Sequence, residues 1–91
     1  MKSSHSTIDK LDSFATVLQW ASIPHILLDF ARLNAPYYCQ RIDEWEFCAA
    51  VLMHLVNIPR DVMNQCLYKL RVPIIITESK EISLINLIFN V

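Results

Sequence analysis

The chain of 91 residues contains no glycine. Glycine adopts positive φ more readily than any other residue, and it builds tight hairpin turns, helix C-caps and phosphate-binding loops. Its absence excludes the glycine-dependent loops of nucleotide-binding and catalytic motifs. It favours helices joined by proline and by asparagine or aspartate turns, with at most a short sheet.

Charged residues are also scarce, at 19% of the chain, and they nearly cancel to a formal net charge of −1. No overall positive field therefore directs the chain toward nucleic acid or an anionic membrane. Hydrophobic residues make up 54%. Because a small domain has a large surface for its volume, we expect some apolar side chains at the surface, where a protein partner or a second copy of the chain covers them.

The three cysteines, Cys39, Cys48 and Cys66, are odd in number and form no C-x-x-C pair. This pattern is unlike that of small secreted domains and predicts a reducing compartment, the cytoplasm or the nucleus. The first ten residues are polar and lack the apolar core of a signal peptide, so we expect no membrane association. We expect a flexible leader over residues 1–6 and a single domain over residues 7–91.

Residues with catalytic or metal-binding chemistry are present but not grouped. No histidine or cysteine lies at the spacing of a metal-ligand pair. The acidic residues Asp43, Glu44 and Glu46 are explained by the start of a helix, where negative charge is favourable. We therefore expect no enzymatic activity, no catalytic residue, no metal, no cofactor and no small-molecule substrate.

Helical spacing of apolar residues predicts four helices, over about residues 7–21, 24–33, 44–56 and 60–71. Ser6 or Thr7 is the expected N-cap of the first helix, and Asp43 is the expected N-cap of the third. The sequence Asn57-Ile58-Pro59 predicts a tight break between the last two helices.

Three β-rich segments predict a small sheet: Tyr37–Ile42, Ile74–Thr77 and Ile82–Phe89. The last two would form a C-terminal hairpin with a charged tip at residues 78–81. The predicted class is α+β, a small winged-helix-like domain of about four helices plus this hairpin. Periodicity also allows a short C-terminal helix from residue 81 onward.

An all-α bundle of two helical hairpins is the alternative architecture. Ile8-Asp9 and Ile42-Asp43 lie 34 positions apart, and the same spacing separates Leu18 from Leu52. Repeats near this length are typical of stacked helical hairpins. Such a chain would act as an adaptor or a chaperone scaffold.

The predicted element order matches that of a winged helix-turn-helix: helix, strand, helix, tight turn, helix and hairpin. The start and body of the fourth helix contain a pattern of proline, a basic residue, an asparagine and then Leu-Tyr-x-Leu. The residues of this pattern are Pro59, Arg60, Asn64, Leu67, Tyr68 and Leu70. This segment resembles the recognition helix of the Zα family, winged-helix domains that bind Z-form nucleic acid. The resemblance implies that Arg60 and Asn64 contact phosphates and that Tyr68 stacks against a base.

The first functional hypothesis is a non-catalytic protein–protein interaction module of winged-helix type, which acts inside a larger assembly or as a homodimer. Large aromatic side chains dominate the energetics of protein interfaces. The aromatic candidates for partner contact are Trp20, Tyr37, Tyr38 and Trp45.

The second hypothesis is a winged helix that binds nucleic acid, which requires clustered positive charge. The residues that would contact nucleic acid, or alternatively a protein partner, are Arg60, Asn64, Tyr68, Lys69 and Arg71.

Overall fold

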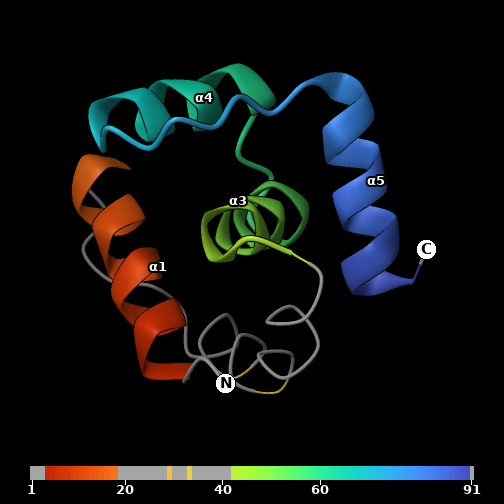
Figure 1. Cartoon of the computed structure of the whole chain (residues 1–91), viewed down its shortest axis with the longest axis horizontal. Helices are drawn as coiled ribbons and strands as arrows, with labels where there is room; N and C mark the ends of the chain where they lie inside the picture. The colour runs from red at the N-terminus through yellow and green to blue at the C-terminus, as the bar shows by residue number, and fades with distance from the viewer. Residues whose placement is uncertain (1–3, 19–28, 30–32, 34–41, 91) are drawn as a thin grey trace.

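The computed structural model describes residues 4–18, 29, 33 and 42–90. Within these ranges the chain forms four helices and no strand. They are α1 (Ser4–Leu18), α3 (Glu44–Leu55), α4 (Arg60–Lys69) and α5 (Glu78–Phe89), labelled as in Figure 1. The described part of the chain is therefore all-α, and the predicted α+β winged-helix class is wrong.

Helix α3 forms the centre of the domain because its middle is apolar on every face. Residues 47–53 are all buried, and Phe47, Val51 and Leu52 are fully excluded from solvent. A helix that is hydrophobic all round must be covered all round. Figure 1 shows α3 nearly end-on, with α1, α4 and α5 arranged around it, and each of these helices contacts it.

Asp43 begins α3, as predicted. Its Oδ1 accepts hydrogen bonds from the main-chain N–H of Trp45 (2.7 Å) and of Glu46 (3.4 Å). These bonds satisfy two of the main-chain donors that the first turn of a helix leaves unpaired. The predicted break after α3 is also confirmed, because Asn57 has a φ of 64° and ends the helical path.

The first predicted helix is confirmed as α1, but it begins at Ser4, upstream of the expected cap. Thr7 is fully buried inside the helix, and the expected leader overlaps its first turn. Leu11 and Phe14 are fully buried in the core that α1 shares with α3. The predicted helix over 24–33 lies outside the described residues apart from 29 and 33. The predicted strand over 37–42 also lies outside them, except Ile42, which is buried in a bend.

The predicted C-terminal hairpin is wrong, because residues 78–89 form helix α5. Thr77 is its N-cap, and its hydroxyl oxygen accepts a hydrogen bond from the N–H of Lys80 (3.1 Å). Glu78 and Glu81 in the first turn favour the helix further. Leu84 is buried and Ile88 half-buried, at the i, i+4 spacing of one helical face rather than in the alternation of a strand.

Residues 72–77, here called the connector, join α4 to α5 and run back along α4 (Figure 1). The turn into the connector is a Schellman motif. The N–H of Arg71 donates to the carbonyl of Tyr68 (3.0 Å), and the N–H of Val72 donates to the carbonyl of Leu67 (2.9 Å). This pair of bonds satisfies the last carbonyls of α4 and reverses the chain.

Asn64 holds the connector against α4. Its side-chain Nδ2 donates to the carbonyl of Ile76 (2.9 Å), and its Oδ1 accepts from the N–H of Ile76 (2.8 Å). Ile76 is 1% exposed, so this one amide satisfies both main-chain groups of a buried residue. Further along, Arg60 Nη1 lies 2.9 Å from Glu81 Oε1 and ties the start of α4 to α5.

Replacement of Asn64 tests this arrangement. Asn64→Ala leaves the N–H and C=O of Ile76 without their partners, and we expect it to lower the free energy of unfolding by about 1–3 kcal/mol. The exposed neighbour Gln65 is the control, and Gln65→Ala should change stability by less than about 0.5 kcal/mol. Urea denaturation measures both. Equal midpoints for the two variants would contradict the role of Asn64.

Candidate interaction surface

The five candidate residues of the predicted fourth helix fall into two groups. Arg60 pairs with Glu81, and Asn64 is bonded to the main chain of Ile76. The phosphate contacts that the Zα resemblance implied for Arg60 and Asn64 would compete with these internal bonds. The remaining three are exposed: Tyr68, Lys69 and Arg71.

An apolar surface runs from the end of α4 onto the connector. Tyr68 is 84% exposed and Ile75 is 75% exposed. Pro73 is also exposed, and it lines the same groove as Tyr68. Exposure alternates along the connector, since Val72 and Ile76 are buried and Ile74 is half-buried, whereas Pro73, Ile75 and Thr77 are exposed. We call this region the α4–connector surface, and its members are Tyr68, Lys69, Arg71, Pro73 and Ile75.

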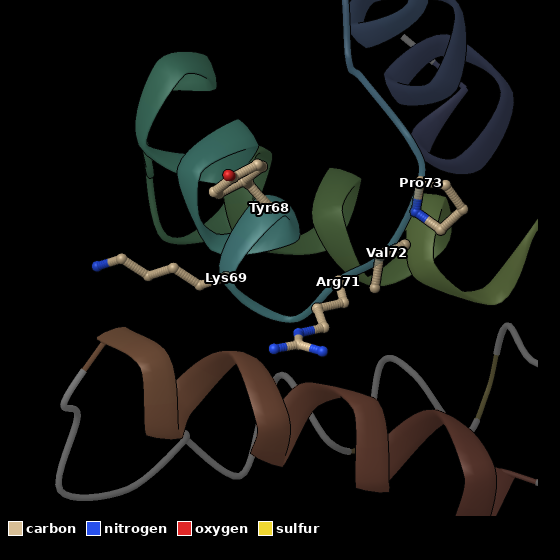
Figure 2. A pocket seen from close by; sticks show the side chains of 5 residues that line it. All are labelled: Tyr68, Lys69, Arg71, Val72 and Pro73. Carbon is tan, nitrogen blue, oxygen red and sulfur yellow. The ribbon is translucent and has the colours of Figure 1, made fainter.

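The surface contains an open groove with a volume of about 580 Å³, lined by Tyr68, Lys69, Arg71, Val72 and Pro73. Figure 2 shows the Tyr68 ring on the outside of α4, with Lys69 extending away from the helix and Arg71 pointing toward α1. The charged groups of Lys69 and Arg71 form no ion pair with any residue that the structure describes. The groove is therefore lined by an exposed aromatic ring and by two cations that form no ion pair among the described residues.

Arg71 occupies a position that usually belongs to glycine. Its φ is 61°, in the left-handed region, at the residue after the cap of α4. A side chain with a β-carbon costs roughly 1–2 kcal/mol in this conformation. The other two positive-φ residues described are asparagines, Asn57 and Asn90, which tolerate it better. An arginine at such a site, with its side chain lining a groove, points to a use for that side chain.

Of the aromatic candidates, Trp20, Tyr37 and Tyr38 lie outside the described residues. Trp45 is half-buried between α1 and α3. Its ring meets Phe14 edge to face, with centroids 5.6 Å apart and an interplanar angle of 76°. Lys10 Nζ lies 5.4 Å from the centre of the same ring. These contacts show that Trp45 contributes to helix packing.

Cys48 and Cys66 are free and buried. Burial raises the pKa of both thiols, and nearby Lys69 partly opposes this for Cys66. The Cys48 thiol donates a long hydrogen bond to the carbonyl of Thr7 (3.7 Å). Within residues 4–18, 29, 33 and 42–90, no three His, Cys, Asp or Glu residues are placed to hold a metal ion. Among the helices of these ranges, none combines the length and apolarity needed to cross a membrane.

Sequence reasoning identified Tyr68, Lys69 and Arg71 but missed Pro73 and Ile75, because it assigned the Ile74–Thr77 run to a sheet. Comparisons with known protein families, with curated proteins and with solved structures found no match. The α4–connector surface is thus defined by its own geometry. It has an exposed tyrosine and isoleucine, two cations without an ion pair among the described residues, and a connector held in place by Asn64.

Two substitutions at Arg71 measure the backbone cost of that position. Arg71→Gly and Arg71→Ala both remove the charge, but only alanine keeps the β-carbon that disfavours positive φ. We expect the glycine variant to be more stable than the alanine variant by about 1 kcal/mol in thermal or urea unfolding. Equal stability would mean that Arg71 does not adopt the left-handed conformation.

The raised pKa of Cys48 has a consequence at alkaline pH. The folded state favours the neutral thiol. Cys48 therefore contributes its full share to the free energy of unfolding below the ordinary thiol pKa of about 8.5, and this contribution falls above it by about 1.4 kcal/mol per pH unit. We expect the stability advantage of the wild type over Cys48→Ala to shrink by about 2 kcal/mol between about pH 7 and pH 10. An advantage that stays constant across this range would contradict the burial of the thiol.

Proposed function

We propose that the domain is a non-catalytic protein-binding module and that the α4–connector surface is its contact site. The observation that carries the proposal is the exposure of Tyr68 and Ile75, at 84% and 75%. Large apolar side chains grouped at a surface are typical of interaction sites, and tyrosine is enriched among the residues that dominate binding energy. The Asn64 bridge supports the proposal, because a surface held in one conformation loses little entropy on binding.

The charge of the surface indicates the chemistry of the partner. Lys69 and Arg71 line the same groove as Tyr68 and are not neutralised by other described residues, although the whole chain has a net charge of −1. Complementary charge favours association and selects partners. The proposed partner is therefore a protein segment that combines an apolar or aromatic side chain with an adjacent carboxylate.

The same two cations beside an exposed tyrosine favour nucleic acid as a second candidate. Few positive groups are available for it, since Arg60 pairs with Glu81 and Lys80 pairs with Glu46. Phosphate neutralisation supplies most nucleic-acid affinity. We therefore place the protein partner first. We also propose that the protein works in the cytoplasm or nucleus, a location with which the free thiols of Cys48 and Cys66 are compatible.

The proposal is tested with a phage-displayed library of random 12-residue peptides, selected on the immobilised full chain. The best peptide is then titrated against the wild type and against Tyr68→Ala. We expect acidic-apolar peptides to be enriched and Tyr68→Ala to weaken binding at least tenfold, as removal of a central aromatic contact does. Leu87→Ala is the control, because Leu87 is 50% exposed on α5, outside the surface, and it should bind like the wild type.

Other outcomes would overturn the proposal. Failure to enrich any peptide, or equal losses in Tyr68→Ala and Leu87→Ala, would remove the surface as a protein-binding site. Binding of duplex DNA or RNA with a steep salt dependence that Tyr68→Ala abolishes would assign the surface to nucleic acid. A dimer in light scattering that dissociates in Tyr68→Ala would assign it to a second copy of the chain.

A further inference from the structure

We infer that the partner binds as an extended segment that adds a strand along the open side of the connector. This inference rests on the proposed protein-binding function and specifies how the α4–connector surface is used. It depends on a property of the main chain, which is bonded on one side of the connector and unbonded on the other.

The inner side of the connector is bonded partly to α4 and partly within the connector, where the N–H of Ile74 donates to the carbonyl of Val72 (2.8 Å). The N–H of Val72 donates to Leu67, and both main-chain groups of Ile76 are bonded to the Asn64 amide. In extended backbone, the main-chain groups of alternate residues point to opposite sides. Ile76 therefore directs its groups toward Asn64 and Ile75 directs its groups to the other side, beyond the tight turn that the Ile74–Val72 bond closes at Pro73. The Asn64 side chain takes the place that a neighbouring strand would occupy beside Ile76.

The outer side of the connector is open. The carbonyl of Pro73, both main-chain groups of Ile75 and the N–H of Thr77 have no hydrogen bond to any residue that the structure describes. All three residues are exposed. Unpaired main-chain groups along an extended segment are a template for another extended chain, and peptides bind to many domains in this way.

The side chains around this edge match the partner already proposed. Ile75 lies on the edge itself, and Tyr68 lies beside its beginning, so both can cover an apolar side chain of an added strand. Lys69 and Arg71 lie at the same end and would receive a carboxylate of the partner. The extended part of the open edge begins after the turn at Pro73 and runs from Ile74 to Thr77, about 10 Å, which matches roughly three to four residues of a partner strand.

The test removes one hydrogen-bond donor and leaves every side chain in place. Cys66 permits this, because a synthetic 66–91 segment can be ligated through its N-terminal cysteine to a recombinant 1–65 thioester. In one full-length product an ester replaces the amide between Ile74 and Ile75 and so removes the Ile75 N–H. We expect this product to bind the selected peptide about 5–10-fold more weakly than the all-amide chain, the loss of one net hydrogen bond.

The matched control places the ester before Ser79, whose N–H is also exposed and has no hydrogen bond but lies outside the edge. This product should bind like the all-amide chain. Urea denaturation confirms that both products fold. As an independent readout, nuclear Overhauser contacts between main-chain hydrogens of Ile75 and of the bound peptide should appear in the unmodified protein.

The outcomes separate the two proposals. If Tyr68→Ala weakens peptide binding but the Ile75 ester does not, and no main-chain contact forms, strand addition is overturned while the protein-binding function stands. If neither change affects binding, both proposals fail. If both changes weaken binding and the Ser79 ester does not, strand addition is supported.

Discussion

The complete burial of the middle of α3 is the constraint on which the domain depends. Residues 47–53 offer no polar face, so the helix is stable only where other helices cover it on several sides. Each fully buried large side chain, such as Phe47 or Leu52, contributes about 1.5–3 kcal/mol. Helices α1, α4 and α5 pack against α3 for this reason, and each contacts it within the part of the chain that the structure describes (Figure 1).

The connector follows from this arrangement in a chain without glycine. The chain must leave α4, reverse direction and reach the start of α5, and the reversal places Arg71 at positive φ. The extended backbone that follows has no neighbouring strand among the described residues, so the Asn64 amide satisfies its buried side. The other side stays open next to Tyr68. Packing of the core and exposure of the proposed binding surface thus have the same structural origin.

The parts of the fold that the sequence predicted correctly are set by local interactions. The Asp43 cap, the break at Asn57–Pro59 and the start of α4 depend on side chains within a few residues of each other, whereas α4 ends at Lys69, two residues before the predicted end. The prediction of a C-terminal hairpin was wrong because an apolar-rich stretch fits both the two-residue period of a strand and the 3.6-residue period of a helix. The pattern of Ile82–Phe89 is compatible with either. The Thr77 cap, with Glu78 and Glu81 behind it, is the signal that identifies the helix.

The candidate site was predictable only in part, because some of its features depend on contacts between residues that are distant in the sequence. Tyr68, Lys69 and Arg71 could be identified from their residue types in and just after the predicted fourth helix. The role of Asn64 could not, since it depends on Ile76, which lies 12 positions away and meets it only in the folded chain. Once that contact is known, the alternation of buried and exposed residues along the connector explains why Ile75 belongs to the surface.

Amide hydrogen exchange at Ile75 and Ile76 in the free protein tests the central claim most directly. The account predicts strong protection of the Ile76 N–H, which is buried and bonded to Asn64, and rapid exchange of the neighbouring Ile75 N–H, which faces solvent. Equal exchange rates at the two positions, or protection of Ile75 in the free chain, would show that the connector does not have one bonded and one open side.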